Sequence, residues 1–273
     1  MEKMQEDSRL FIRHHHLRTE TPDASVFERH CHNYFELLYV AAGSGKAVVE
    51  GAEYPLIPGA LFLFRPLEYH YVRPDHTTPY ERYVINFGKD IPMEEAARFP
   101  LLQHGTDVRT GAFFPPGQNS ESFAKIFPLL DLEEGLSDGA KRTLSRTVVT
   151  QVLLLLGKNE LPSSEAEETL AARIVDYLND NLATPLTLDE VAKRFFISKY
   201  YLCRVFRGST GVSVMHFVNT KRVAFAKELI EKGVPATEAA LEAGFHDYSV
   251  FYRACRKTTG RAPVAGRGQS KNT

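Results

Sequence analysis

The chain has 273 residues, enough for two domains with a core each, and its formal net charge of −1 hides an uneven distribution. Residues 169–273 contain 16 Lys and Arg against 9 Asp and Glu, a net of +7, whereas the preceding residues carry a net of −8. A basic part joined to an acidic part indicates a nucleic-acid-binding module attached to a different module. The three cysteines are widely spaced and odd in number, which argues against a disulfide framework. We therefore expect a cytoplasmic protein, without a signal segment or a membrane span.

The first third of the chain has the pattern of an all-β domain. Short runs rich in β-branched and aromatic residues are separated by turn signals such as Gly43-Ser44-Gly45 and Pro58-Gly59. The predicted strands are 35–41, 46–50, 60–64, 69–72 and 80–87. Regular short strands of this kind are typical of a small barrel or jelly roll. The polar residues 1–21 are expected to form a movable arm over it.

Several polar side chains cluster in this β-rich part: His30, His32, Tyr34, Glu36 and His70. Alternate residues of a strand point to one face, which would place His30, His32 and Glu36 together. Their mixture of donors, acceptors and aromatic surface suits a pocket for a polar small molecule such as a sugar. Two or three imidazoles and a carboxylate can also hold Zn, Fe(II) or Mn, and a facial arrangement suits oxygenase chemistry. An effector pocket, a metal-dependent enzyme and a merely structural barrel rim all stay open at this point.

A helical segment is predicted over residues 119–157. Two stretches, 119–130 and 139–157, flank an acidic bend at 131–138. The second stretch carries an apolar stripe that includes Val148, Val152 and Leu156. Such a stripe can pair two subunits, or it can pack back against the protein's own barrel. Residues 158–168, which are rich in serine and glutamate, have the composition of a flexible linker.

Two later stretches repeat each other at an offset of 49 residues. Each begins with a helix-capping residue, Ser198 or Asp247, shows an apolar face, and ends in Thr-Gly. A short helix precedes each one: Thr187 and Glu190 form a capping box in the first copy, and Gly244 supplies the turn in the second. A short helix, a turn and a second helix make a helix-turn-helix unit, whose second helix enters the major groove of DNA.

A continuous helix is predicted between the two units, from Ser213 to a cap at Gly233. A helix of about 20 residues is roughly 30 Å long. This length is close to the ~34 Å that separate successive major-groove faces on one side of B-DNA. One chain is therefore predicted to read two adjacent turns of a duplex.

Helix geometry also selects the side chains that would face DNA. Arginine can bind guanine with two hydrogen bonds, whereas contacts to phosphate position the protein without specifying sequence. The predicted base-reading residues are Lys199, Tyr200, Arg204, Tyr248, Ser249 and Arg253. The predicted phosphate contacts are Arg207, Lys221, Lys257 and Arg267.

Three C-terminal motifs, Ala240–Phe245, Tyr252-Arg253 and Gly260–Pro263, carry a family resemblance. They resemble the signature of AraC/XylS-type transcriptional regulators, and the resemblance extends over roughly residues 169–267. The order of His30, His32, Tyr34, Glu36 and His70 resembles the cupin-like sensor half of the same family. Side chains at positions 236, 239, 255 and 266 are smaller than is usual there, so the second unit is expected to be loosely packed.

This resemblance implies an α+β multidomain protein. The expected domains are a cupin-like effector-sensing barrel at 1–118, dimerisation helices at 119–157, a linker at 158–168, and an all-α double helix-turn-helix domain at 169–273. It further implies a non-catalytic, homodimeric regulator that binds double-stranded DNA and activates transcription through RNA polymerase. The implied effector is a sugar or a related metabolite.

The family resemblance does not decide what the cluster of His30, His32, Tyr34, Glu36 and His70 binds. Sensor halves of the family commonly carry these histidine and glutamate positions without metal. We accordingly expect an effector pocket and no metal or other cofactor. The alternatives are a metal-dependent cupin enzyme fused to a DNA-binding domain, and a regulator whose barrel binds no ligand.

Overall fold

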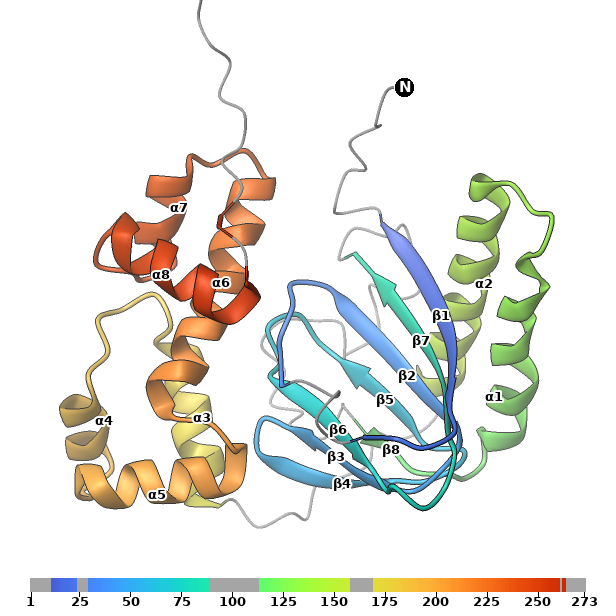
Figure 1. Ribbon diagram of the computed structural model, residues 1–273, viewed down its shortest axis with the longest axis horizontal. Helices are drawn as coiled ribbons and strands as arrows, with labels where there is room; N and C mark the ends of the chain where they lie inside the picture. The colour runs from blue at the N-terminus through green and yellow to red at the C-terminus, as the bar shows by residue number, and fades with distance from the viewer. Residues whose placement is uncertain (1–10, 24–28, 89–112, 158–168, 261, 264–273) are drawn as a thin grey trace, which may run out of the picture.

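Figure 1 shows the computed structural model, in which a β-sandwich lies between two sets of helices. The structure describes residues 11–23, 29–88, 113–157, 169–260 and 262–263. Residues 1–10 of the expected arm, the expected linker at 158–168 and Arg267 lie outside the described residues. Within the described part, no helix combines the length and the apolar character that crossing a membrane requires.

The described strands of the N-terminal half form two antiparallel sheets. The larger sheet has the strand order β1 (Ile12–Thr19), β7 (Tyr80–Phe87), β2 (Phe35–Ala42), β5 (Leu61–Phe64) and β8 (Phe113–Phe114). The smaller sheet has the order β4 (Ala52–Leu56), β3 (Gly45–Val49) and β6 (His70–Pro74). Apolar side chains from both sheets, including Leu38, Phe62 and Val72, are buried together between them. The predicted all-β sensor half is thereby confirmed, including each of its five expected strands to within a few residues.

The polar segment before this half is a strand rather than an arm. Strand β1 pairs with β7 along its whole length, from Ile12 opposite Phe87 to Thr19 opposite Tyr80. The expectation of a movable arm over residues 1–21 is therefore wrong for residues 12–19. Strand β1 carries histidine at positions where a sheet strand usually carries apolar residues, so the sequence lacks the usual alternation. The His14 Nδ1 atom lies 2.8 Å from the Ser145 Oγ atom, which fixes this strand to a helix instead.

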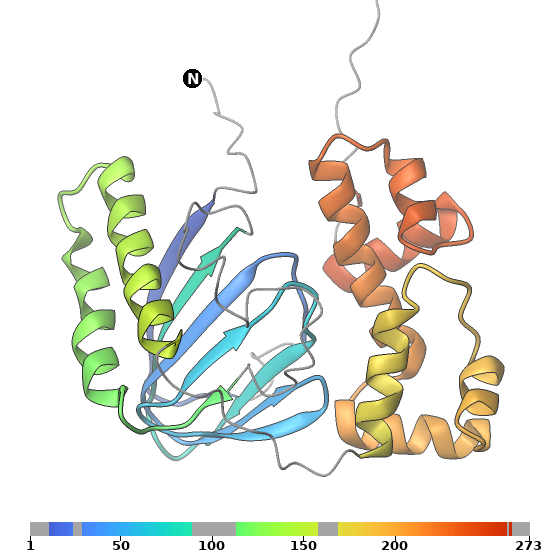
Figure 2. The same cartoon turned by 180° about the vertical axis from the view of Figure 1, so that it is seen from behind.

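A helical layer covers the outer face of the larger sheet (Figures 1 and 2). It contains α1 (Ser120–Ile126), the 3-10 helix η4 (Phe127–Glu133) and α2 (Asp138–Gly157). Val148, Val152 and Leu156 of α2 are buried in one cluster with side chains of the sheet. The apolar stripe thus packs against the protein's own sheet. This is the second of the two uses that the sequence left open for it, the first being the pairing of two subunits. Homodimer formation stays a prediction, and it would have to use other side chains of this layer.

The described residues of the C-terminal half form six helices. They are α3 (Leu170–Asp180), α4 (Leu188–Arg194), α5 (Lys199–Thr210), α6 (Val214–Glu231), α7 (Ala236–Glu242) and α8 (Tyr248–Thr259). Helices α4 and α5 form the first helix-turn-helix unit, and α7 and α8 form the second. Helix α6 connects the units, and its 18 residues give a length of ~27 Å. The predicted double helix-turn-helix domain is confirmed by this order.

Each unit has its own core. Leu202 and Phe206 of α5 are buried with Phe217 of α6 in the first unit. In the second unit Phe251 and Cys255 of α8 are buried in a cluster that is otherwise rich in alanine. Small side chains therefore do fill the second core, while its loose packing stays a prediction.

Candidate nucleic-acid interface and effector site

The first recognition helix is bounded as the sequence predicts. The capping box of Thr187 and Glu190 starts α4, and Phe196 forms the following turn with a positive φ of 56°. The Ser198 Oγ atom accepts the N–H of Tyr201 at 3.2 Å and so starts α5. Gly211 ends α5 in the left-handed conformation that glycine adopts without strain. These local signals fix the orientation of α5 relative to α4.

The base-reading residues predicted on α5 are all exposed. The side chain of Tyr200 is 77% exposed, and Lys199 lies 3.0 Å from Asp189 in a surface ion pair. The Arg204 guanidinium lies over the ring of Tyr201, 5.2 Å from its centroid. This contact limits the freedom of the guanidinium while leaving it in solvent, where it is available to a guanine edge.

Helix α8 repeats the arrangement with one difference. The Asp247 carboxylate accepts the N–H of Val250 at 2.8 Å, and this backbone hydrogen bond is the main cause of the lowered pKa of that carboxyl group. Ser249 and Arg253 are exposed, as expected for base readout. Tyr248 instead packs beside Phe251, with ring centroids 5.8 Å apart. Part of the Tyr248 ring therefore contacts the core of the second helix-turn-helix unit.

The predicted phosphate contacts divide into three cases. Arg207 is exposed on α5, and Arg267 lies outside the described residues. Lys257 is exposed but borders a cavity between the two halves. Lys221 is only 2% exposed, and its Nζ atom lies 2.7 Å from the Glu50 carboxylate of the barrel. The assignment of Lys221 to phosphate is therefore wrong for this arrangement, because the side chain has a buried partner and cannot reach solvent.

The Glu50–Lys221 ion pair is the centre of a polar contact between the halves. Asn179 of α3 donates to Glu50 at 3.1 Å and accepts from Lys221 at 2.7 Å. The Ser209 hydroxyl, near the end of α5, donates to the carbonyl oxygen of Gly51 at 3.0 Å. The turn between β3 and β4 thus holds three helices of the DNA-binding half in place.

Tyr69 adds an apolar contact to this interface. Its ring centroid lies 5.4 Å from that of Phe217, and the side chain is buried in the core of the first helix-turn-helix unit. Burial raises the pKa of the Tyr69 hydroxyl well above its ordinary value. One barrel residue therefore completes the core of the other half, which ties the position of α6 to that of the barrel.

A cavity of about 850 Å³ lies beside these contacts, between the barrel and helices α6 and α8. Of the five predicted effector-binding residues, His30, His32 and Tyr34 line it, whereas Glu36 and His70 do not. Basic side chains outnumber acidic ones in its lining, where Glu231 is the acidic residue. The basic residues are Arg29, Arg73, Lys227 and Lys257. This lining can bind a polar ligand, and its charge favours one that carries an anionic group.

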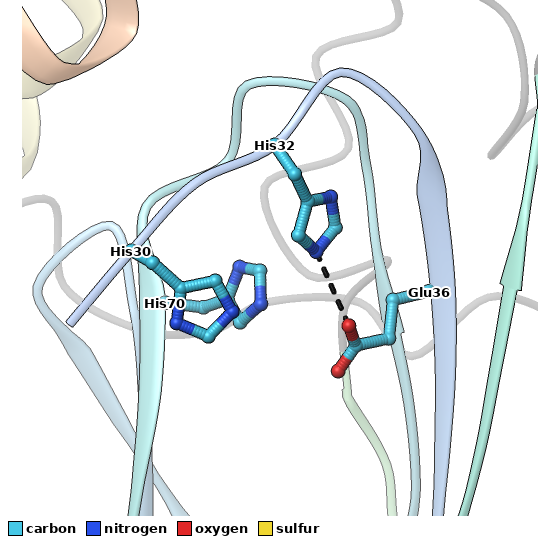
Figure 3. A group of neighbouring side chains, drawn as sticks. All are labelled: His30, His32, Glu36 and His70. Atoms are coloured by element: carbon cyan, nitrogen blue, oxygen red, sulfur yellow. Dashed lines mark hydrogen bonds and ion pairs between the residues drawn. The ribbon is translucent and has the colours of Figure 1, made fainter. Parts of the chain in front are cut away.

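Four of the predicted effector residues form the group drawn in Figure 3. One nitrogen or carboxylate oxygen from each of His30, His32, Glu36 and His70 lies within 4.8 Å of the others. The backbone brings them together, because His30 and His70 exchange two hydrogen bonds of 3.1 and 2.9 Å. Burial lowers the pKa of His70 well below its ordinary value. The structure thus places these four side chains next to one another, while their role in effector binding stays a prediction.

Comparison with known proteins covers both halves. Residues 13–130 match the model of the AraC-like ligand-binding domain, and residues 191–269 match that of a helix-turn-helix domain. The chain belongs to the AraC family of transcription regulators. The first half is accordingly a ligand-binding domain and the second a DNA-binding domain.

Relatives of the chain in this family are transcription regulators rather than enzymes. The HTH-type transcriptional activator RhaR of an Enterobacter species is 22% identical over 254 residues, which cover 90% of this chain and 89% of RhaR. The regulator YbfI of Bacillus subtilis is 25% identical over 224 residues, which cover 82% and 80% of the two chains. Among solved structures, ToxT from Vibrio cholerae is 13% identical, covers 92% of this chain and 95% of its own, and has a TM-score of 0.39.

Sequence reasoning missed the residues that join the two halves of this AraC-family protein. Glu50, Asn179 and Lys221 are separated by 129 and 42 positions along the chain, and each is unremarkable in its local pattern. Their role arises only when the barrel turn meets α3 and α6. One signal was present: the residues one helical turn before and after Lys221 are apolar, so this face of the helix is expected to be buried, and a buried lysine needs a partner.

Proposed function

We propose that this regulator binds two adjacent major-groove segments through α5 and α8, under the control of a metabolite in the cavity between its halves. The cavity carries this proposal, because residues of both the ligand-binding domain and the DNA-binding helices line it. A ligand there contacts the barrel and α6 at once. If the ligand binds one placement of the DNA-binding helices more tightly than another, it stabilises that placement. The gain in free energy equals the difference between the two binding free energies.

The effector class follows from the lining. Histidine and tyrosine side chains offer the hydrogen bonds and ring faces that a sugar uses, and the four basic residues add a preference for negative charge. We therefore propose a sugar or a related metabolite that bears a carboxylate or a phosphate. A regulator with this effector would act as a homodimeric activator that recruits RNA polymerase, in keeping with the activator RhaR among its relatives.

Selection from genomic fragments with the purified full-length protein at ~0.15 M salt tests DNA recognition first. One enriched motif that spans two major-groove segments per protomer is expected, and the genes beside it nominate the effector. Uniform binding to all fragments, with and without a panel of sugar acids and sugar phosphates, would refute specific recognition.

Operator affinity across the same panel tests the effector. One compound is expected to change operator affinity in the wild type and to lose this effect in Lys227→Ala, because Lys227 lines the cavity away from both reading faces. Lys232→Ala is the matched control, since Lys232 is an exposed basic residue of the same half that lies outside the cavity lining and belongs to neither set of predicted DNA contacts. A panel without any effect would instead support a barrel that binds no ligand.

A further inference from the structure

The backbone fixes the proton positions of two histidines in the group of Figure 3. The Nδ1 atom of His32 lies 2.9 Å from the carbonyl oxygen of Tyr34, and that of His70 lies 2.9 Å from the carbonyl oxygen of Glu68. A carbonyl oxygen only accepts hydrogen bonds, so each Nδ1 atom carries a proton. In the neutral rings both Nε2 atoms therefore present a lone pair. Metal-binding histidines are oriented by the same kind of outer hydrogen bond.

The two Nε2 atoms lack suitable donors. His70 is 2% exposed, and its Nε2 atom has no hydrogen-bond partner among the residues that the structure describes. The Nε2 atom of His32 lies 3.2 Å from a carboxylate oxygen of Glu36, so two acceptors face each other when the ring is neutral. Buried acceptors without donors are unfavourable, whereas a cation between them satisfies both.

We propose that His30, His32, Glu36 and His70 bind one divalent transition-metal ion. Three imidazoles and one carboxylate suit Zn²⁺, Fe²⁺ or Mn²⁺, whereas Ca²⁺ and Mg²⁺ prefer oxygen ligands alone. Ligand atoms about 2.0–2.2 Å from a tetrahedrally coordinated metal lie ~3.3–3.6 Å apart. The present spread of 4.8 Å therefore requires a contraction of somewhat more than one ångström, for which the side chains must rotate on metal binding.

Ring packing prepares the group for this role. The ring of His70 stacks on Phe64 with centroids 4.0 Å apart, and the ring of His32 stacks on Tyr34 at 3.8 Å. These contacts hold both imidazoles in place from outside the group. His30 and His32 also line the cavity, so a bound ion would border the space in which we place the effector.

A proton is the competing occupant. A protonated His32 would form an ion pair with Glu36 and remove the conflict between those two groups. It would leave the Nε2 atom of His70 without a donor, which favours the metal. Metal binding does not depend on the proposed effector, so the two ideas can fail separately.

The test uses untagged full-length protein from which metal has been stripped with a chelator. Titration with Zn²⁺ in a calorimeter and with Co²⁺ in an absorption spectrometer is expected to show one ion per chain. His30→Ala and Glu36→Gln are expected to weaken Zn²⁺ binding at least ~100-fold, because each removes one of four ligands. His30 is exposed and Glu36→Gln keeps its shape, so both variants should fold, which circular dichroism verifies.

The run His14 to His16 on β1, in which His15 is exposed, offers a matched control, because it is the other concentration of histidine in the described chain. His15→Ala is expected to bind Zn²⁺ like the wild type. Loss of binding in His15→Ala alone would place the ion on β1 and overturn the proposal. Absence of Zn²⁺ and Co²⁺ binding at micromolar concentrations would also overturn it and would favour the shared proton.

Discussion

Replacement of Glu50 by glutamine is the most direct test of the contact between the two halves. The side chains of Glu50 and Lys221 are 19% and 3% exposed, and their charged atoms lie 2.7 Å apart. Glu50→Gln leaves the Lys221 ammonium buried, with the neutral Asn179 amide as its hydrogen-bond acceptor. Removal of one partner of a buried ion pair costs about 3–5 kcal/mol, and we expect the lower end because Glu50 is partly exposed and the amide keeps one acceptor.

This free energy acts on the equilibrium between closed and separated halves. A loss of about 3 kcal/mol shifts that equilibrium roughly 150-fold toward separation. Small-angle X-ray scattering is expected to show a larger radius of gyration for Glu50→Gln than for the wild type. Glu53→Gln is the matched control, because Glu53 pairs with Lys46 at 2.7 Å on the same hairpin but both side chains are more than half exposed. Surface pairs of this kind contribute less than ~1 kcal/mol.

A double variant sharpens the same test. Glu50→Gln combined with Lys221→Met removes the buried charge altogether, so we expect it to recover most of the closed form. The reasoning is refuted if Glu50→Gln behaves like Glu53→Gln. It is equally refuted if adding Lys221→Met to Glu50→Gln restores nothing.

Three further predictions concern DNA recognition, pH and local stability. Arg204→Ala and Arg253→Ala should each weaken operator binding by about 1–3 kcal/mol and relax specificity at different bases, as binding to a library of operator variants would show. No change for Arg253→Ala would confine readout to the first unit. Burial lowers the pKa of His14, so the unfolded chain takes up a proton more readily and stability falls as the pH drops below ~6.5. The melting temperature should therefore fall more between pH 7.5 and 5.5 in the wild type than in His14→Gln, and equal falls would contradict this. Pro235 precedes helix α7 and provides no side-chain cap, whereas Thr187 caps α4, so amides of α7 should exchange hydrogen faster than those of α4. Slower exchange in α7 would show that packing outweighs the missing cap.

The DNA-binding half was predictable because its signals are local. Ser198 and Asp247 accept backbone N–H groups at helix starts, and Gly211 and Gly260 end the same helices with positive φ. Each signal depends on residues within four positions of one another. Local chemistry therefore decides these boundaries, and the structure reproduces them within one residue.

The barrel was less predictable where polar residues form strands. Strand β1 contains three consecutive histidines, and β4 contains a glutamate and a proline, so neither shows strict alternation. Hydrogen bonds to the neighbouring strands hold them in the sheets: β1 pairs with β7, and β4 pairs with β3. The local sequence of β1 and β4 does not predict this pairing. The polar site residues were easier, because period-two spacing points to His30 and His32, and the family resemblance points to His70 as well.

Contacts between distant segments could not be read from the sequence. The stripe on α2 is equally suited to a second subunit or to the protein's own sheet, and only the structure shows Val152 packed on the sheet side. Lys221 carries the positive charge that suits a phosphate contact, yet in the structure it forms an ion pair with Glu50. In both cases the residue type is compatible with two partners, and tertiary structure chooses between them.

The interface also implies that the two reading helices respond unequally to the effector. On α5 the reading residues lie in the first half, while the contact of Ser209 with the barrel lies at the opposite end. On α8 the last turn, with Lys257 and Thr259, lines the cavity itself. An effector there contacts α8 directly, whereas it reaches α5 indirectly, through α6, Val212 and the barrel turn that Ser209 contacts. The half-site read by α8 should therefore gain or lose more affinity on effector binding than the half-site read by α5. Because linkage is reciprocal, mutation of the α8 half-site should also weaken the effect of DNA on effector affinity more than mutation of the α5 half-site does.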